Sequence, residues 1–301
     1  MTFDRAGISD IRQLVALRLA YLREDSGALS ALDEARIRRD LPGYFERHLN
    51  DDLAAFIARE GDAVIGCAML LRVDKPMSPA FINGRTGMVL NVYTRPEYRG
   101  RRLMGKLISR AKKLARDDGY ETLWISTGET GLYEKYGAEY VTNMTDARGG
   151  DSRIYRMDAY GFYGWKDADV KARTNDYPGI ETPKDLYRVL WHVWSKETCT
   201  ARMREDWTEE NATLGQCTIT AFLAQDIFGG RVWGVPLEDG NFHCFNAVEN
   251  RIFDLTSEQF GDRKLDYSLR HEQLRHDHFM KPGKRERYEA LKEALKQELK
   301  P

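Results

Sequence analysis

Apolar and polar residues alternate along several short segments in the first half of the chain, and this period of two predicts strands. The predicted strands cover residues 54–59, 63–71, 92–94, 122–127 and 153–157. Gly61-Asp62 marks a tight turn between the first two. Between the third and the fourth, apolar residues recur at helical spacing, at Leu103, Leu107, Ile108 and Ala111. The pattern predicts an α/β unit in which a helix connects two strands.

The second half of the chain has its own set of predicted elements. Thr182-Pro183-Lys184-Asp185 is typical of a helix start, because threonine caps the first turn and proline suits the first helical position. A buried helix is predicted over 218–228, where Gly229-Gly230 ends it. Strands follow at 231–235, 242–248 and 251–255, and an apolar stripe predicts a last, docked or partner-facing helix over 285–300. This half therefore predicts a smaller α+β unit.

A length of 301 residues and a hydrophobic content of 42% allow two domains of ordinary size, each with its own core. We place the first domain at residues 1–157 and the second at 182–301. Residues 158–181 are rich in glycine, aromatic and charged residues without a clear period, and we interpret them as a connector.

Charge and composition exclude several classes of partner. Lys plus Arg number 46 and Asp plus Glu number 47, so no net charge draws the chain to nucleic acid or to a membrane. No apolar run approaches the roughly 20 residues of a membrane span, and the first residues lack a signal-peptide core. Four scattered cysteines do not form a disulfide framework, and the histidines between 271 and 278 match no common zinc spacing. We expect a cytoplasmic protein with free thiols and no metal.

The segment from Asn91 to Leu107 combines a strand end, a basic turn and a helix start. Backbone N–H groups and cations gather in this turn and in the strand end before it. The residues are Val92, Tyr93, Thr94, Arg99, Gly100, Arg101, Arg102, Leu103, Met104 and Gly105. The N-terminus of a helix offers free N–H groups and a positive potential to a phosphate. The segment therefore predicts a pyrophosphate-binding turn, with a plain surface loop as the alternative.

This turn resembles the acetyl-CoA loop of the GCN5-related N-acetyltransferase (GNAT) family, (Q/R)-x-x-G-x-(G/A), which falls on Arg99 to Met104. Arg99 fits, whereas Arg102 and Met104 stand where the family prefers small residues. The hairpin of residues 54–71, the strand of residues 122–127 and an LYEK segment around Tyr133 follow the family's order. The resemblance covers residues 1 to about 157 and implies a GNAT fold with a mixed sheet.

The resemblance to the GNAT family also implies a reaction. Acetyl-CoA or another acyl-CoA would be the co-substrate, with its pantetheine arm beside Val92 to Thr94 and its pyrophosphate on Arg99 to Gly105. A small-molecule or peptide amine would attack the thioester, and Tyr133 would protonate the departing thiolate. The alternative for Tyr133 is an aromatic residue packed under the loop. A homodimer is left open.

The second half carries residues suited to thiol chemistry. Cys217 lies in the first turn of a predicted helix, whose N-terminal partial charge favours a thiolate. His243 lies on a strand and Asp254 on the next strand, eleven positions later, so the two can pair across a hairpin. Papain-like and transglutaminase-like enzymes are similar, because a thiolate needs an imidazole and the imidazole needs an acceptor. Gln216 would polarise an oxyanion or merely close the loop. A buried helix cysteine and a satisfied strand histidine are the alternative.

The same segment resembles the YunG-like family. The resemblance rests on Gly215-Gln216-Cys217, on the HxxN pattern from His243 to Asn246, and on Asp254-Leu255-Thr256. It covers roughly residues 190–260 and implies no particular reaction.

Two classes of function follow. The first is a bifunctional enzyme, in which an acetyl-CoA-dependent N-acyltransferase acting on an amine is fused to a thiol-dependent amidase, peptidase or amide-transfer domain. The second is an acyl-CoA-binding sensor or scaffold. In that case Arg102 and Met104 reflect a weakened cofactor site, and the second domain is a partner-binding module without catalysis.

Overall fold

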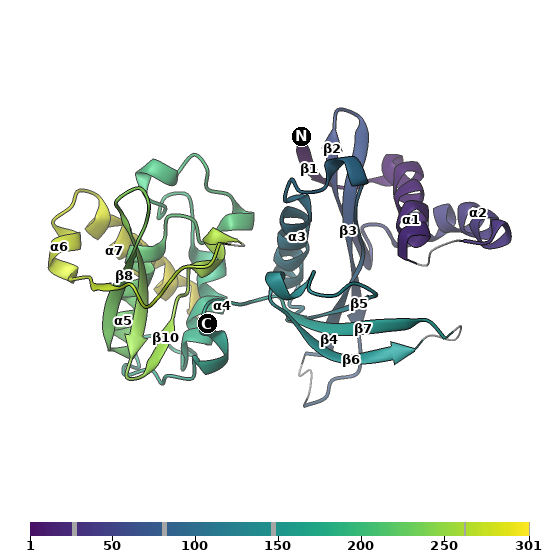
Figure 1. The fold of residues 1–301 in the computed structure, drawn as a ribbon. Coiled ribbons are helices and arrows are strands. Elements are labelled where there is room, and N and C mark those ends of the chain that lie inside the picture. Colours follow the sequence, from purple (N-terminus) through teal and green to yellow (C-terminus); the bar gives the residue numbers. More distant parts are fainter. Residues whose placement is uncertain (26–28, 80–82, 146–148, 262, 301) are drawn as a thin grey trace. The chain divides into compact units, whose positions relative to one another are not determined.

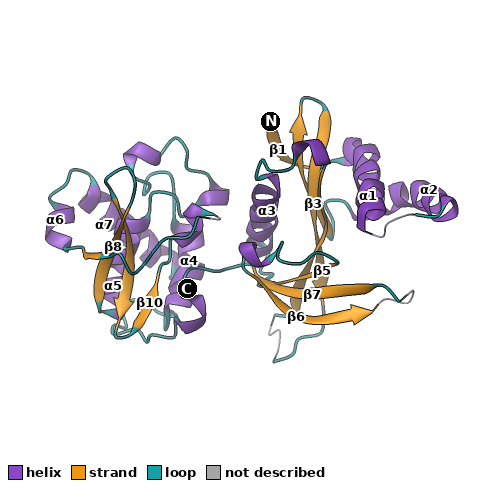
Figure 2. Ribbon diagram, viewed as in Figure 1, coloured by secondary structure: helices purple, strands orange, loops and turns teal. Residues whose placement is uncertain are grey.

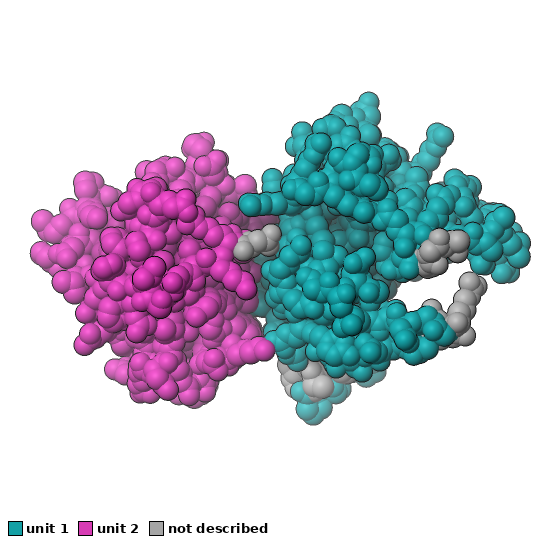
Figure 3. All heavy atoms as spheres, viewed as in Figure 1, with its two compact units in different colours: residues 1–160 teal, residues 161–301 magenta. Residues whose placement is uncertain are grey.

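The computed structural model describes residues 1–25, 29–79, 83–145, 149–261 and 263–300. The chain divides into two units, Met1–Tyr160 and Gly161–Pro301 (Figure 3). No helix of the described ranges has the length and apolar character needed to cross a membrane.

Unit 1 is built on a seven-stranded sheet in the order β1-β2-β3-β4-β5-β7-β6 (Figures 1 and 2). Its strands are β1 (Thr2–Arg5), β2 (Leu53–Glu60), β3 (Ala63–Asp74), β4 (Arg85–Thr94), β5 (Thr122–Thr127), β6 (Ala138–Thr145) and β7 (Asp151–Asp158). Among the strands that the structure describes, only β4 and β5 pair in parallel, because α3 (Leu103–Asp117) connects them. The predicted α/β fold with a mixed sheet is confirmed.

Helices cover both faces of this sheet (Figure 1). On one face, α3 buries Leu107 and Ile108 against Phe56 of β2. On the other face, α1 (Ile11–Asp25) and α2 (Ala31–His48) pack against residues such as Ile57. Successive residues of a strand point to opposite faces of the sheet, and helices cover both faces here. For this reason β2 needs an almost continuous run of apolar residues.

The ladder between β4 and β5 ends early. Its parallel register runs from Thr86 and Thr122 to Val89 and Ile125. Beyond this point β4 bulges at Asn91, which has a positive φ of 47°, and the register with β3 shifts. A bulge bends its strand and leaves backbone groups unpaired. The two strands therefore continue beside the start of α3 without further pairing to each other.

Unit 2 packs helices against a four-stranded antiparallel sheet in the order β10-β9-β8-β11. Its elements are α4 (Pro183–Val193), α5 (Cys217–Phe228), β8 (Arg231–Pro236), β9 (Phe242–Val248), β10 (Arg251–Phe253), β11 (His271–Glu272), α6 (Arg275–Phe279) and α7 (Lys284–Glu298). The helix α5 lies against β9 and is buried on nearly all sides, which agrees with its apolar sequence. At the start of α4, the Asp185 carboxylate accepts hydrogen bonds from the backbone N–H and the hydroxyl of Thr182.

Residues 161–168 fold as part of unit 2. The N–H of Asp254 donates to the carbonyl of Tyr163 at 2.9 Å, and the Phe162 ring lies edge-on to Tyr187 of α4. Gly164 has a φ of 87°, and a Cβ there would lie 2.1 Å from the Ile252 carbonyl oxygen. Only glycine permits both this conformation and this approach to β10.

Candidate functional sites

The predicted phosphate-binding turn lies between β4 and the N-terminus of α3. Gly100 and Arg102 both have positive φ angles, 77° and 59°, and Arg102 is the residue just before the helix. The first N–H groups of a helix have no acceptor within that helix, so those from Leu103 onward are available to a ligand. At Gly105 an added Cβ would lie 3.2 Å from Cε1 of Tyr136, so glycine allows this ring to pack on the first turn.

Arg99 is held beside this turn by unit 1 itself. Its Nη2 lies 2.5 Å from Oε2 of Glu24, and its Nε donates to the Thr94 carbonyl at 3.1 Å. Tyr93 donates its hydroxyl to the same carboxylate at 3.2 Å. Half of the Arg99 side chain is exposed, and exposed ion pairs contribute little to the free energy of folding. An incoming pyrophosphate can therefore displace Glu24 from Arg99 at small cost.

The bulge in β4 is fixed by contacts within unit 1. Asn91 is buried, and its Nδ2 donates to the Cys67 sulfur at 3.1 Å, while Arg18 donates to its Oδ1 at 3.3 Å. These contacts fix the bulge and leave the backbone from Val92 to Thr94 at the edge that faces the end of β5. The predicted pantetheine-binding segment thus lies beside the predicted pyrophosphate-binding turn.

Tyr133 lies at the same end of the sheet, in the turn between β5 and β6. Its ring is buried, with its centroid 6.2 Å from that of Tyr155. Burial, and then the charges of groups that include Glu129 and Asp25, raise the pKa of its hydroxyl well above the ordinary value. The phenol therefore keeps its proton at neutral pH and can serve as a proton donor.

The predicted thiol site is assembled in unit 2. Cys217 is the first residue of α5 and is only partly buried, whereas Cys67, Cys199 and Cys244 are buried. On β9, the Nε2 of His243 lies 2.6 Å from Oδ2 of Asp254, which follows β10. The structure thus brings the strand histidine and the aspartate together, and Nδ1 is the ring nitrogen left for the thiol.

Electrostatic interactions favour the charged forms of this cysteine and histidine. The pKa of the Cys217 thiol lies well below its ordinary value. A hydrogen bond from Cys244 and interactions with His243 lower this pKa, whereas burial opposes the shift. Burial alone would lower the pKa of His243, but Asp254 and Cys217 raise it to about 10. A thiolate beside an imidazolium is the arrangement that a cysteine nucleophile requires. The Thr218 hydroxyl lies 3.9 Å from the Cys217 sulfur and 3.5 Å from that of Cys244.

Asp254 is held by partners that the sequence did not reveal. Tyr267 donates its hydroxyl to Oδ2 at 2.7 Å, and Thr256 donates its N–H and its hydroxyl to Oδ1 at 3.0 and 3.2 Å. The Tyr163 ring stacks on Tyr267 with centroids 3.9 Å apart. Together with the bond to His243, these contacts give Asp254 four hydrogen bonds, which offset the free-energy cost of burying its carboxylate.

Gln216 has its side-chain N–H committed to the loop. Its Nε2 donates to the Ser195 carbonyl at 3.0 Å, and its buried Oε1 has no hydrogen-bond partner among the described residues. This contact corresponds to the loop-closing alternative. The first N–H groups of α5, beside Cys217, have no acceptor within that helix.

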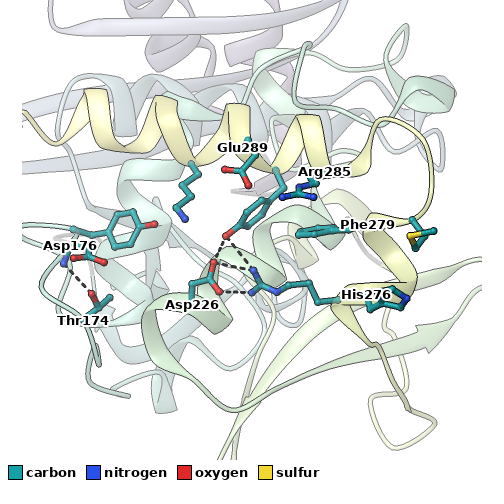
Figure 4. A pocket seen from close by; sticks show the side chains of 12 residues that line it. Thr174, Asp176, Asp226, His276, Phe279, Arg285 and Glu289 are labelled. Atoms are coloured by element: carbon teal, nitrogen blue, oxygen red, sulfur yellow. Dashed lines mark hydrogen bonds and ion pairs between the residues drawn. The ribbon is translucent and has the colours of Figure 1, made fainter.

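Unit 2 also contains an open cavity of about 710 Å³ between α7 and the segment 174–177 (Figure 4). Asp226 binds both Arg275 and the Tyr288 hydroxyl there, so the central charges compensate one another. None of the thiol-site residues lines this cavity.

Comparisons with known proteins divide the chain in the same way. Residues 16–138 match the model of the acetyltransferase (GNAT) family, and residues 182–300 match that of the YunG protein family. The uncharacterized protein YunG of Bacillus subtilis (strain 168) is 35% identical over 72 residues, which are 24% of this chain. The match spans 57% of the length of that relative.

Two solved structures are similar to unit 1. A predicted acetyltransferase from Clostridium acetobutylicum, solved with acetyl-CoA, is 26% identical over 48% of this chain and 94% of its own, with a TM-score of 0.43. A GCN5-related N-acetyltransferase from Ralstonia eutropha JMP134 is 24% identical over 50% and 99%, with a TM-score of 0.44. By the two family models, the chain joins a GNAT acetyltransferase domain at residues 16–138 to a YunG-family domain at residues 182–300.

Proposed function

We propose that unit 1 transfers an acyl group from acetyl-CoA, or another acyl-CoA, to an amine of a small molecule or peptide. The observation that carries this proposal is the early end of the β4–β5 ladder beside the start of α3. Backbone groups from Val92 to Thr94 on the edge toward β5, where the ladder has ended, would bind the pantetheine arm. The N–H groups from Arg99 to Gly105 would take the pyrophosphate.

The transfer needs few groups from the protein. The amine nitrogen forms a bond to the thioester carbonyl carbon, the carbon–sulfur bond breaks, and the amine loses a proton. Tyr133, whose hydroxyl holds its proton at neutral pH, would give that proton to the departing thiolate. The proton lost by the amine returns through solvent to the Tyr133 phenolate, which regenerates the tyrosine. Asp74 pairs with Arg85 at the opposite end of β4 and is therefore unsuited to act as a base for the amine.

Calorimetry with acetyl-CoA tests the binding turn. Replacing Arg99 and Arg101 together by alanine should weaken binding, because each charge-assisted hydrogen bond contributes roughly 1.5–3 kcal/mol. Lys113→Ala removes one cation near the far end of α3 and is the control. Unchanged affinity in the double variant would rule out this turn as the pyrophosphate site.

Release of CoA thiol over a panel of amines tests the reaction. We expect turnover with at least one amine. Binding of acetyl-CoA without turnover would favour the other class of function, an acyl-CoA-binding sensor or scaffold, in which Arg102 and Met104 reflect a weakened cofactor site.

We also propose that unit 2 is a thiol-dependent hydrolase or amide transferase, of the amidase or peptidase kind, with Cys217 as nucleophile. The Cys217 sulfur would form a bond to a substrate carbonyl carbon, and N–H groups of α5 would bind the oxyanion. His243 would then protonate the leaving amine as the thioester forms. Water or a second amine would attack this thioester and release the thiol. The bond between His243 and Asp254 supports this proposal most directly.

Alkylation by iodoacetamide, with mass spectrometry of each cysteine, tests the nucleophile. Cys217 should react faster than the three buried cysteines in the native protein, and still do so at pH 6 to 7, because its thiol pKa is lowered. His243→Ala should remove this preference. Equal rates at Cys217 in the two proteins would contradict activation by His243.

A further inference from the structure

Two basic residues of α7 lie near the Cys217 thiol and are held by neutral groups. Lys284 places its Nζ 2.8 Å from Nδ1 of His278, and Arg287 donates from Nη1 to the Thr198 carbonyl at 3.1 Å. Among the described residues, neither forms an ion pair with a carboxylate. Both side chains are partly buried, where a cation is ordinarily paired with an anion.

The loop that holds Arg287 packs on the turn before Cys217. Thr200 donates its N–H to the Gly215 carbonyl at 3.1 Å, and a Cβ at Gly215 would lie 2.7 Å from the Cys199 sulfur. The negative charge of Cys217 acts on both basic residues and partly offsets the lowering of their pKa by burial. The two cations are therefore close enough to Cys217 to interact with its charge.

His278 adds no charge to this group. A lysine ammonium can only donate, so Nδ1 of His278 is the acceptor, and Nε2 donates to Oε1 of Gln273 at 2.9 Å. Burial, with the nearby Lys284, lowers the pKa of His278 to about 4. Lys284 and Arg287 thus add positive charge to the surroundings of Cys217, in addition to the imidazolium, whereas His278 adds none.

We propose that the thiol site takes acyl substrates that carry a carboxylate close to the reacting carbonyl, and that Lys284 and Arg287 select them. This inference rests on the proposed function of Cys217. The carboxylate would supply the anionic partner that the two cations lack. An alternative is that the cations act only on the thiolate and not on the substrate.

Two alkylating reagents of similar size and different charge separate these possibilities. Iodoacetate is an anion and iodoacetamide is neutral, and with each the sulfur forms a bond to the reagent carbon while iodide leaves. Both react with the thiolate, so the thiolate fraction cancels in the ratio of the two rates. The ratio at Cys217 therefore reports only how the surroundings treat a negatively charged reagent.

We expect the iodoacetate-to-iodoacetamide ratio at Cys217 in the full chain to exceed that of the urea-unfolded protein by about tenfold or more, since a cationic cleft concentrates anions. Lys284→Met and Arg287→Met should each lower the ratio roughly three- to tenfold, and 1 M NaCl should lower it further. Arg285→Met removes an exposed cation of the same helix that lines the separate cavity, and it should leave the ratio unchanged.

A folded ratio equal to the unfolded one would overturn the inference while leaving a reactive Cys217, and hence the proposed nucleophile, in place. A Cys217 that reacts no faster than the buried cysteines would overturn the nucleophile and this inference with it. Arg287→Lys, which keeps the charge, should keep the high ratio even if loss of the Thr198 contact lowers stability. Loss of the preference in this folded variant would contradict a role of the charge.

Discussion

The hydrogen bond from Tyr267 to Asp254 offers a direct test of how unit 2 orients His243. Tyr267→Phe removes the hydroxyl, which lies 2.7 Å from the carboxylate oxygen that also binds His243. The ring stays in place, since it is buried, stacks on Tyr163 and meets Phe245 edge-on at 5.0 Å. The substitution therefore isolates one hydrogen bond without creating a cavity in the core.

The expected loss follows from the charge of the acceptor and from burial. A hydrogen bond to a charged group contributes roughly 1.5–3 kcal/mol, so the free energy of unfolding of unit 2 should fall by that amount. Urea unfolding followed by tryptophan fluorescence measures it, because five of the six tryptophans lie in unit 2, at positions 165, 191, 194, 207 and 233. The alkylation rate of Cys217 at pH 7 should fall as well, since Asp254 would hold His243 less firmly.

Tyr163→Phe is the matched control, because it removes a hydroxyl from the exposed partner of the same stacked pair. Exposed substitutions away from such contacts usually change stability by less than about 0.5 kcal/mol. Equal losses in the two variants, or an unchanged alkylation rate in Tyr267→Phe, would refute the idea that Tyr267 positions the aspartate.

Three further predictions concern the remaining features. Tyr133→Phe should lower kcat for acyl transfer more than acetyl-CoA affinity, whereas equal losses in steady-state kinetics and calorimetry would make Tyr133 a packing residue. Because the pKa of His278 falls from 6.5 to about 4 on folding, the unfolded chain binds the proton more tightly, so stability should drop between pH 7 and pH 5 by up to about 2 kcal/mol. In urea titrations, the free energy of unfolding of His278→Gln should drop less between pH 7 and pH 5, whereas that of the control His276→Gln should drop as much as in the unmodified protein. Gly164→Ala should destabilise unit 2 by more than about 1–2 kcal/mol, which is the ordinary cost of a left-handed conformation in a residue other than glycine. The cost should be higher here because the added Cβ would also meet the Ile252 carbonyl oxygen. An unchanged midpoint of thermal unfolding would contradict this account.

Local sequence determined the elements that carry both candidate sites. The predicted strands over 122–127 and 242–248 agree with β5 and β9, because alternation and bounding turns act within a few residues. Cys217 was predicted for a first helical turn and is the first residue of α5. His243 and Asp254 could be brought close from sequence because a short hairpin places their segments side by side, although the register pairs Phe253 with Asn246 and leaves Asp254 just beyond β10.

Contacts between distant segments could be decided only by the tertiary structure. Tyr267 follows Asp254 by thirteen positions in an irregular segment, and no periodic pattern brings its hydroxyl to the carboxylate. Likewise, Lys284 and Arg287 look like ordinary surface residues of a charged helix until α7 packs against α5. Tyr163 has its backbone partner at Asp254, far along the chain, so no local pattern in residues 161–168 reveals this contact. Sequence alone thus determined the elements that carry the candidate sites and their chemical groups. Packing determined which charges surround the thiol, since those contacts depend on side chains far apart in the chain.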